Sequence, residues 1–352
     1  MGLLQKVKSR LRLPLEIIKT RIQKTPKPLV VLLYVTDRCN LACKYCVGNW
    51  SNRKIKDFST DEIKRIISEC VELGSVHFTI HGGEILLRED TEEVISFIKN
   101  KGAYVNVVTN GIILPENIEK LKGVDSLCIS LDGKEEANDA NRGKNSYQKI
   151  IKAIEAAVTN NFPLAVQSTI TKNNMKEIPF LVENAKKYGY QQQFSLLLKP
   201  LNDKNDQLGL TDEEMKTSLL EIRRYKALGY PVFTSYRTLD NAINWPFSYS
   251  EARVKKHDVN PEHNMIPCYY GKLKLVIDAN GFAFPCSSLN DSFSAKNVLE
   301  VGVKEAYQHI LDSNDCECCY YLTQNDWSLL LGMDIPQYWG MAKIQLKQLL
   351  SK

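Results

Sequence analysis

The 352-residue chain lacks any apolar run of about 18 residues, so no segment of the sequence predicts a membrane-spanning helix. Its basic start also lacks the apolar core and small-residue cleavage site of a signal peptide, so we expect a cytoplasmic protein. Internal repeats and low-complexity tracts are absent as well. The apolar fraction of 43% and the charged fraction of 25% are ordinary for a globular protein. This length can form one large domain with an appendage.

Excess positive charge is missing outside the first 27 residues. Those residues carry eight Lys and Arg against Glu16 alone, a net charge of +7, whereas the whole chain carries +5 and the remainder therefore −2. A nucleic-acid-binding protein would carry a basic patch on its body. We therefore expect no nucleic-acid partner.

The ten cysteines are the most informative residues that are present. Disulfides are rare in the cytoplasm, so this many cysteines indicates metal ligation. Eight of the ten fall into two groups described below. Cys70 and Cys128 lie within a helical and a strand pattern, and we interpret them as small buried apolar residues.

Short β-branched apolar runs alternate with helical patterns over the first 200 residues. The predicted strands are Leu29–Val35, Val76–Ile80, Tyr104–Val108, Ser126–Ser130, Leu164–Ile170 and Gln193–Leu198. Helix-start signals lie between them, such as Ser59 ahead of Ile63 and Ser146 ahead of Ile150. The alternation predicts an α/β fold with right-handed β-α-β units and a parallel sheet, open or closed as a barrel. In such folds the chemistry gathers at the carboxyl ends of the strands.

The pattern changes after Pro200. We predict, in order, a helix over Thr211–Leu228, a strand near Val232–Ser235, an irregular stretch to Pro267, a hairpin within residues 269–285 and a helix over Gln337–Leu350. The hairpin turns at Asp278-Ala279-Asn280-Gly281. The chain is therefore expected to have three parts, a basic amphipathic helix over residues 1–27, a main domain over residues 28–235 and a smaller domain over residues 236–352.

Three cysteines follow the first predicted strand, in the sequence Cys39-Asn40-Leu41-Ala42-Cys43-Lys44-Tyr45-Cys46. The C-x3-C-x2-C spacing on a loop lets three thiolates converge on one face of a cluster. A closed zinc site needs four ligands, and no fourth cysteine or histidine is near in the sequence. The spacing therefore suggests a [4Fe–4S] cluster with one open iron, at which a cofactor can chelate. Three structural thiols, or a zinc site completed from a distance, are the alternatives.

This cysteine motif resembles that of the radical S-adenosylmethionine (SAM) family, and the resemblance covers residues 29–200. His81-Gly82-Gly83-Glu84 follows the second strand and resembles the family's GGE motif, although Ile85 stands where the family usually has proline. The resemblance implies that Gly82, Gly83 and Glu84 meet the methionyl ammonium of SAM. Glycine permits close approach, and a carboxylate is a natural ammonium partner. A structural loop is the alternative interpretation.

Further landmarks of the resemblance lie downstream. Ser130-Leu131-Asp132-Gly133 ends the fourth strand, and Arg142 follows; the resemblance implies that Ser130 touches the SAM ribose and that Arg142 pairs with its carboxylate. Tyr45 is similar to the residue that flanks the adenine, and Thr169 is expected to face SAM from the end of the fifth strand. Ordinary helix-start and strand roles are the alternatives for Arg142 and Thr169. The resemblance implies a partial (β/α)6 radical SAM barrel with the cluster and SAM at its top.

The second cysteine group comprises Cys268, Cys286, Cys316 and Cys319, with Cys318 beside them. Together with Phe284-Pro285-Cys286 after the hairpin turn, it resembles the auxiliary-cluster extension of SPASM and the shorter twitch domains. No cysteine follows Cys319, so we expect one auxiliary [4Fe–4S] cluster held by those four cysteines. Cys316 and Cys319 have the C-x2-C spacing of a chelating turn, and Cys318 is expected to point elsewhere. A zinc site is the alternative.

The resemblance also implies the chemistry. A flavodoxin- or ferredoxin-type donor reduces the first cluster, which cleaves SAM to methionine and a 5′-deoxyadenosyl radical that abstracts hydrogen from a substrate. Three classes of function follow: oxidation or rearrangement of a small-molecule, sugar or lipid-linked substrate; peptide or protein modification by a SPASM-type maturase; and a non-catalytic iron–sulfur protein. The GGE motif, Ser130 and Arg142 argue against the last. No catalytic side chain is identified.

One apolar stripe marks the N-terminal segment. Its residues recur at steps of three and four and are Leu3, Leu4, Val7, Leu11, Leu15, Ile18 and Ile22, with Lys and Arg around them. Pro14 is expected to kink or split this helix. The helix either packs across the barrel with a solvated basic face, or lies in the plane of a membrane with its stripe among the acyl chains. The second interpretation predicts peripheral membrane contact through residues 1–25.

Overall fold

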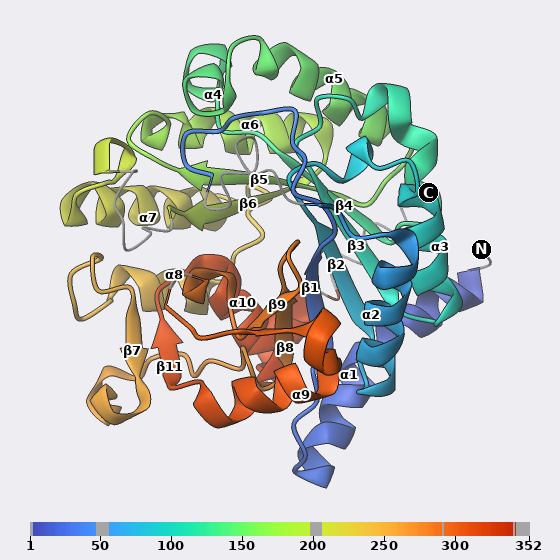
Figure 1. Cartoon of the computed structure of the whole chain (residues 1–352). Helices are drawn as coiled ribbons and strands as arrows, with labels where there is room; N and C mark the ends of the chain where they lie inside the picture. The colour runs from blue at the N-terminus through green and yellow to red at the C-terminus, as the bar shows by residue number, and fades with distance from the viewer. Residues whose placement is uncertain (1–2, 47–55, 198–205, 291, 341, 343–352) are drawn as a thin grey trace. The chain divides into compact units, whose positions relative to one another are not determined.

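The computed structural model describes residues 3–46, 56–197, 206–290, 292–340 and 342. Within these residues the chain forms two compact units (Figure 1). The first is drawn from Met1–Ala42, Gly48–Cys128 and Tyr270–Asn314, and the second from Cys43–Val47, Ile129–Tyr269 and Asp315–Lys352. The chain passes between them within strand β4 (Ser126–Ser130). Each unit is therefore assembled from segments that are far apart in the sequence.

The sheet of the first unit has the strand order β10-β9-β8-β1-β2-β3. Its strands are β1 (Val30–Tyr34), β2 (His77–His81), β3 (Tyr104–Thr109), β8 (Lys274–Ile277), β9 (Phe282–Phe284) and β10 (Lys296–Asn297). Strand β1 lies between β2 and β8 and pairs with both in parallel, so Val31 is opposite Phe78 on one side and Leu275 on the other. These three side chains are fully buried, as expected for the middle of a sheet covered by helices.

The predicted hairpin therefore continues the main sheet. Its strands β8 and β9 pair antiparallel across the turn that ends at Gly281, as the sequence predicts. Gly281 has a φ of +89°, and a Cβ there would lie 2.6 Å from the side-chain oxygen of Asn297, so both the turn and its neighbour require glycine. The hairpin segment is thus part of the core of the first unit.

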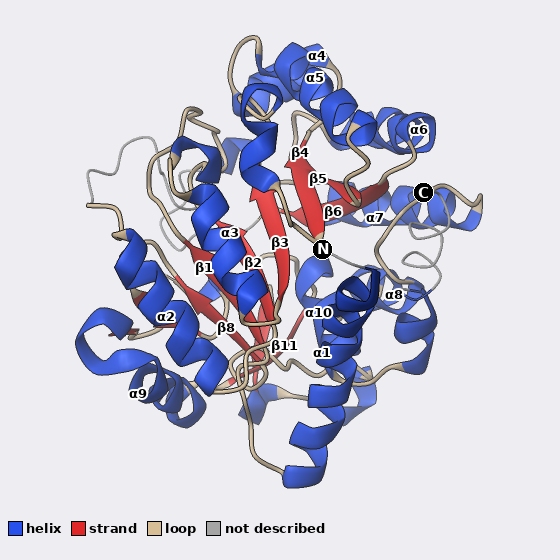
Figure 2. Cartoon of the chain, turned by 90° about the vertical axis from the view of Figure 1, so that its right-hand side faces the viewer, coloured by secondary structure: helices blue, strands red, loops and turns tan. Residues whose placement is uncertain are grey.

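Four long helices belong to the first unit, namely α1 (Leu3–Gln23), α2 (Thr60–Glu72), α3 (Thr91–Asn100) and α9 (Val298–Ser313). Figure 2 shows α2, α3 and α9 beside the strands β1, β2, β3 and β8. Ser59 and Glu62 form a reciprocal capping box that starts α2, as the sequence signal predicts. Helix α9 is tied to α2 because Glu69 Oε2 accepts the Val303 N–H at 2.7 Å. Helix α1 runs unbroken across Pro14.

The second unit contains the parallel pair β5 (Leu164–Ile170) and β6 (Gln191–Leu196). It also contains the antiparallel pair β7 (Arg253–Lys255) and β11 (Cys316–Cys319). Its helices are α4 (Glu135–Arg142), α5 (Ser146–Thr159), α6 (Ile178–Tyr188), α7 (Asp212–Ala227), α8 (Tyr236–Ile243) and α10 (Leu322–Leu331). In Figure 1 the helices α4, α5 and α6 lie around β5 and β6. Strands β5 and β6 thus have the helix cover typical of parallel sheets.

Three details of the second half differ from the sequence prediction. The strand expected near Val232 is a single bridge between Val232 and Gln192. The stretch expected to be irregular contains helix α8, whose start is capped by the Ser235 side chain accepting the Thr238 N–H. The C-x2-C segment is a strand with a bulge between Cys316 and Cys318, and not a turn.

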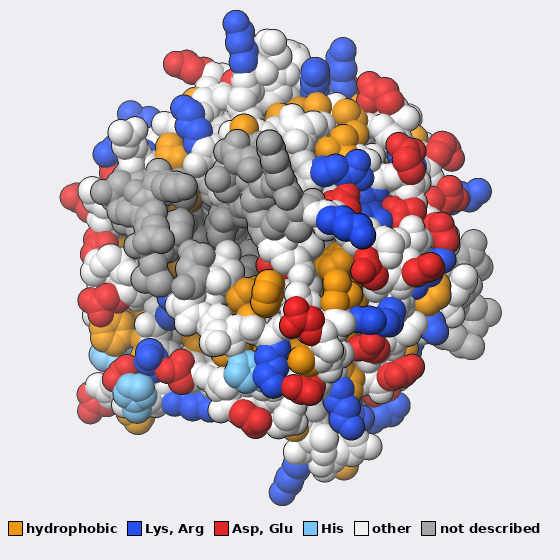
Figure 3. Space-filling view, viewed as in Figure 1, with side chains coloured by type: hydrophobic (Ala, Val, Ile, Leu, Met, Phe, Trp, Pro, Cys, Tyr) orange, Lys and Arg blue, Asp and Glu red, His pale blue; other side chains and the backbone are white. Residues whose placement is uncertain are grey.

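The predicted closing helix is only partly described. Residues 335–340 are helical, and the rest of the predicted span to Leu350 lies outside the described residues apart from residue 342. Among the helices that the structure describes, none has the length and apolar content needed to cross a membrane. Acidic and basic side chains are interspersed over the face drawn in Figure 3. The described residues of that face therefore form no large field of one sign.

Candidate functional site

The first part of the cysteine loop is held by the glycines of the GGE motif. The Gly83 N–H donates to Thr36 O at 2.9 Å, and the Glu84 N–H donates to Arg38 O at 2.8 Å. A Cβ on Gly83 would lie 2.3 Å from Arg38 O and 2.9 Å from the Cβ of Cys39. Only glycine permits this approach. The motif therefore fixes the position of Cys39, the first cysteine of the loop that follows β1. This role is additional to any contact of the motif with a cofactor.

An acidic residue missed by the sequence analysis supports the same loop. Asp57 accepts hydrogen bonds from Thr36 Oγ1 and from Arg38 Nε, each at 2.7 Å. Its Oδ1 also accepts the Asp37 N–H at 3.3 Å. No spacing rule links residue 57 to the cysteine motif, so only the fold places the two together.

The Glu84 carboxylate is buried and hydrogen-bonded on both oxygens. Oε1 accepts from Thr109 Oγ1 at 2.8 Å and from the Leu86 N–H at 3.1 Å, and Oε2 accepts from the Asn110 N–H at 2.8 Å. Burial raises the pKa of Glu84, and these three donors oppose the rise. A carboxylate has about four acceptor positions, so one remains for a ligand such as an ammonium group. Glu84 thus joins the carboxyl ends of β2 and β3.

Asn110 connects Glu84 to the cysteines. Its side-chain Nδ2 donates to Asn40 Oδ1 at 2.7 Å and lies 3.8 Å from Cys39 Sγ. The Leu41 N–H points to the same sulfur at 3.5 Å. Donors directed at a cysteine sulfur are typical of iron–sulfur ligands, whose potential they tune. The sequence analysis missed Asn110, although its place directly after β3 is where functional residues of this fold class gather.

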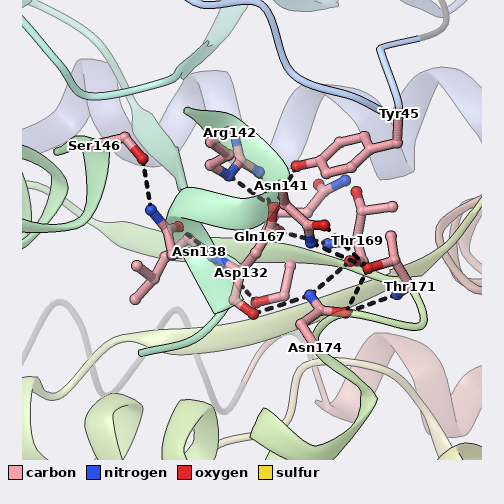
Figure 4. Close-up of polar contacts among 12 residues, drawn as sticks. Tyr45, Asp132, Asn138, Asn141, Arg142, Ser146, Gln167, Thr169, Thr171 and Asn174 are labelled. Carbon is pink, nitrogen blue, oxygen red and sulfur yellow. Dashed lines mark hydrogen bonds and ion pairs between the residues drawn. The ribbon is translucent and has the colours of Figure 1, made fainter. Parts of the chain in front are cut away.

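The second unit contains a group of three residues, namely the half-buried Tyr45 and the buried Asp132 and Arg142 (Figure 4). The Tyr45 hydroxyl donates to Asp132 Oδ2 at 2.6 Å. Arg142 Nε lies 2.9 Å from Asp132 Oδ2, and Nη2 donates to Oδ1 at 3.2 Å. The Arg142 guanidinium also lies over the Tyr45 ring, 5.5 Å from its centroid. Asp132 therefore ties the cysteine loop, through Tyr45, to the end of helix α4, where Arg142 is the last residue.

The charges within this group compensate each other. Burial opposes the charge of Arg142, but Asp132, Tyr45 and Cys43 together outweigh that effect and raise the pKa of Arg142. Burial also raises the pKa of Tyr45, so its hydroxyl remains a donor at neutral pH. Burial likewise raises the pKa of the Cys43 thiol, whereas the Arg142 cation opposes the rise. The Arg142 side chain is thus a fixed positive group beside Cys43.

Asparagines complete the polar network at the carboxyl ends of the strands in Figure 4. Asn174 Nδ2 donates to Asp132 O at 2.9 Å and to Thr169 O at 2.8 Å. Asn141 accepts the Lys44 N–H of the cysteine loop on its backbone oxygen at 2.9 Å, and its side chain bonds Thr171 at 3.1 Å. These asparagines were missed because asparagine is common in loops and gives no motif by itself.

Ser130 is the last residue of β4, and Thr169 is the last but one of β5, close to the strand end where it was predicted. Ser130 is half-buried. The Thr169 N–H donates to Asp132 Oδ1 at 3.1 Å, and its hydroxyl lies 3.1 Å from Ser195 Oγ on β6. Thr169 therefore belongs to the same network through its backbone, and its side chain is directed to the neighbouring strand.

The expected cysteine ligands lie in both units. Cys39 belongs to the first, whereas Cys43 and Cys46 belong to the second, in which the Cys46 N–H donates to Cys43 O at 3.1 Å. None of the ten cysteines, all of them within the described ranges, forms a disulfide. Across the described residues, no three Cys, His, Asp or Glu side chains are close enough to hold a metal ion. The convergence of these thiols therefore stays a prediction. The three thiols lie on one loop and are half-buried, and donors are directed at Cys39, so their chemistry fits an iron–sulfur cluster.

The second cysteine group is divided in the same way. In the second unit, the Cys268 N–H donates to Glu317 O at 2.7 Å, which places Cys268 beside Glu317 of β11, the residue that follows Cys316. The buried Cys318 thiol lies 3.5 Å from Met265 Sδ, and burial raises the pKa of Cys318 to about 11. Cys286 belongs to the first unit, where its sulfur lies 3.2 Å from Ser288 Oγ. The ligand set stays a prediction, and the surroundings of Cys318 are those of a structural thiol.

Comparisons with known proteins identify the family of the chain. The radical SAM superfamily model matches residues 33–204. The AdoMet-dependent heme synthase of Methanosarcina barkeri is 32% identical over 305 residues, which cover 82% of this chain and 84% of that protein. The mycofactocin maturase MftC of Mycolicibacterium smegmatis is 28% identical over 289 residues, or 80% of this chain and 70% of that protein. The chain belongs to the radical SAM superfamily.

Solved structures show the same fold. Streptococcus suis SuiB bound to S-adenosylmethionine superposes with a TM-score of 0.64 at 17% identity, over 82% of this chain and 68% of SuiB. A further structure of SuiB holds its precursor peptide SuiA. The predicted α/β fold of the partial radical SAM barrel with a cysteine-bearing extension is confirmed. So are the enzyme class and the predicted cofactors of the family, namely SAM and a [4Fe–4S] cluster that binds it. The alternative of a non-catalytic iron–sulfur protein is therefore wrong. The auxiliary cluster stays a prediction.

Proposed function

We propose that Cys39, Cys43 and Cys46 hold the SAM-binding cluster and that the enzyme abstracts hydrogen from a small-molecule substrate. The observation that carries the assignment is the hydrogen bond between Tyr45, inside the cysteine loop, and Asp132, which also pairs with Arg142. It couples the loop that carries two of the thiols to a cation suited to the carboxylate of SAM. When bound and reduced, the cluster supplies the electron that cleaves SAM to a 5′-deoxyadenosyl radical.

The chain's own residues then have separate tasks. Glu84 offers its remaining acceptor position to the ammonium group of SAM, with Gly82 and Gly83 beside it. Arg142 is held by Asp132 in one orientation and attracts the SAM carboxylate. We expect Ser130 to meet the ribose, Thr169 to face SAM and Tyr45 to flank the adenine. Positioning by such rigid groups is what a protein contributes to cofactor chemistry.

We assign the auxiliary cluster to Cys268, Cys286, Cys316 and Cys319. The matched superfamily region, residues 33–204, falls inside the domain that we place at residues 28–235, and the four cysteines fall in the domain at residues 236–352. Residues 1–27 are the third part. A fully ligated auxiliary cluster is suited to accepting an electron from a substrate radical, so we favour net oxidation. The electron donor is of the flavodoxin or ferredoxin type.

The small-molecule class is favoured by one comparison. The relative named AdoMet-dependent heme synthase aligns over more than four-fifths of both chains, and the activity in its name concerns a small molecule. Peptide modification is the second candidate, because MftC is named a maturase and SuiB has been solved with a precursor peptide. Sugar and lipid-linked substrates remain within the first class. We place the enzyme in the cytoplasm, and its membrane contact is a separate proposal that does not depend on this chemistry.

A variant test addresses the cluster assignment. The protein is reconstituted anaerobically and reduced, and 5′-deoxyadenosine is quantified with SAM present. Changing Cys39, Cys43 and Cys46 together to Ala should abolish the product while the spectroscopic signal of the auxiliary cluster persists. Product formation by the triple variant would show that the assignment is wrong.

A second test distinguishes the substrate classes. Low-molecular-mass cell extract is added to the reduced enzyme, with and without prior protease treatment, and stimulation of 5′-deoxyadenosine formation is measured. Stimulation that survives protease supports a small-molecule substrate. Stimulation that protease removes supports the peptide alternative instead.

A further inference from the structure

Helix α1 has two apolar faces, and only one of them packs against the protein. Ile17 is fully buried, and Leu13 is 8% exposed. The predicted stripe points the other way: the exposed fractions are 56% for Leu11 and Leu15, 39% for Ile18 and 77% for Ile22. The remaining stripe members, Leu3, Leu4 and Val7, have side chains outside the description. The stripe is therefore not what attaches α1 to its unit.

Helical geometry separates the two faces cleanly. At about 100° per residue, Leu11, Leu15, Ile18 and Ile22 fall within an arc of roughly 60°. On the same wheel Leu13 and Ile17 lie roughly opposite, centred about 200° away. Burial of Leu13 and Ile17 therefore directs the four-residue stripe outward. An outward row of large aliphatic side chains on a helix already packed on its other side needs a partner to explain it.

Cations flank the stripe on both sides. Arg12 and Lys19 lie on one flank and Arg21 on the other, and Lys19 and Arg21 are exposed. The only acidic residue of the segment, Glu16, lies near the buried face and pairs with Lys19 at 2.6 Å. This arrangement matches the surface of an anionic bilayer. The apolar side chains in the middle can enter the acyl layer, and the cations at both edges can meet the anionic headgroups.

We propose that the stripe of Leu11, Leu15, Ile18 and Ile22 is a membrane-docking surface that holds the enzyme reversibly on anionic lipid. The charge of the segment favours lipid over a second copy of this chain. Two copies paired through the stripe would bring their flanking Arg and Lys rows together, and like charges repel. An anionic headgroup layer neutralises the same rows.

The position of α1 in the first unit also sets the orientation. Arg12 Nη1 donates to Lys101 O at 3.0 Å, and Lys101 lies just before the start of β3. Helix α1 thus contacts the edge of the sheet where the parallel strands begin. Cys39, Glu84 and Asn110 follow the opposite ends of β1, β2 and β3. A docked helix therefore turns the cysteine edge of this unit away from the bilayer, so docking localises the enzyme and does not by itself present a lipid to the site.

Vesicle flotation tests the docking surface. The full-length holoenzyme is mixed with vesicles of phosphatidylcholine and phosphatidylglycerol, or of phosphatidylcholine alone, at low and high salt. We expect flotation with the anionic vesicles only, and its loss at high salt. The double variant Leu15→Glu/Ile18→Glu should stay at the bottom, whereas the matched control Leu220→Glu/Leu228→Glu, which adds the same charge at exposed leucines elsewhere, should float like the wild type.

Three results would overturn the proposal. One is failure of the wild type to float, and another is equal flotation of both double variants. The third is a dimer in solution, measured by light scattering without vesicles, that Leu15→Glu/Ile18→Glu dissociates, since the stripe would then bind a second copy. None of these readouts involves SAM cleavage, so they are independent of the proposed chemistry.

Hydrogen exchange tests the orientation. On adding anionic vesicles, peptides from residues 8–22 should gain protection, and peptides covering residues 81–88 and 109–114 should keep their free rates. Gain of protection at residues 81–88 and 109–114 would contradict the proposal that the cysteine edge is turned away from the bilayer.

Discussion

Tyr45 and Asp132 are joined by a 2.6 Å hydrogen bond, although 86 residues separate them in the chain. Through it the loop that carries two predicted cluster ligands is tied to the end of β4. Asp132 also neutralises the buried Arg142, so one carboxylate holds both a cysteine loop and a cation in place. Site assembly in this protein therefore depends on a residue for which the sequence motif suggested no role.

Asp132→Asn should destabilise the protein strongly. The substitution leaves the Arg142 cation buried without its counter-ion, and such losses cost about 3–5 kcal/mol. Tyr45→Phe removes one neutral donor to this carboxylate and should cost less, about 1.5–3 kcal/mol. Denaturant unfolding of anaerobic protein measures both changes, with the exposed Glu136→Gln as the control near zero. Equal effects of Asp132→Asn and the control would contradict the compensating role of Asp132.

Gly83→Ala should displace the first cysteine. Its Cβ would meet Arg38 O at 2.3 Å, and backbone cannot move aside as a flexible side chain does. We expect loss of the SAM-binding cluster, hence about half of the iron of a two-cluster protein. Gly340→Ala is the matched control, since a Cβ there meets nothing within 4 Å. Iron analysis distinguishes the two variants, and full iron content in Gly83→Ala would argue against the packing role.

The two adjacent cysteines of β11 should behave differently. Reconstituted protein should contain about eight iron atoms per chain, on the order of two cubane clusters. Cys318→Ala should leave that content nearly unchanged, because its thiol contacts Met265, whereas Cys319→Ala should lower it. A content of about four iron atoms with one zinc would instead indicate a zinc site at these thiols.

Asp326 should make stability depend on pH. Burial raises its pKa to about 6, against the opposing Ser235 and Thr238 donors. The folded state therefore binds this proton more tightly than the unfolded chain, whose Asp pKa is about 3.9. The contribution is present at low pH and is lost as pH rises through about 6, which amounts to about 1 kcal/mol between about pH 5 and about pH 7.

Asp326→Asn keeps the acceptor oxygen and removes the titration. The free energy of unfolding of the variant, minus that of the wild type, should therefore rise by that amount over the same pH interval. The exposed Asp258→Asn serves as the control and should show no such trend. A pH-independent difference for Asp326→Asn would contradict the raised pKa.

Much of the fold could be predicted from local sequence patterns. The predicted Ser126–Ser130 and Leu164–Ile170 strands match β4 and β5, and the other four strands predicted before Pro200 differ by one or two residues at their ends. Buried parallel strands are continuous β-branched runs, and Ser59 with Glu62 marks a helix start, so both signals lie within a few neighbouring residues. Helix α8 was missed because its short amphipathic pattern follows an isolated serine cap.

The sequence by itself determined the chemistry of the protein. The cysteine spacing and the GGE motif each lie within a few neighbouring residues, and the cofactors that they bind require these residue types at these spacings. Only the tertiary structure decided how those residues are held. Asp57, Asn110 and Asp132 reach the cysteine loops from elsewhere in the chain, and parallel strands bring such distant residues to one edge of a sheet. The same is true of α1: the periodicity shows the stripe, but the burial of Leu13 and Ile17 on the opposite face decides that the stripe points outward.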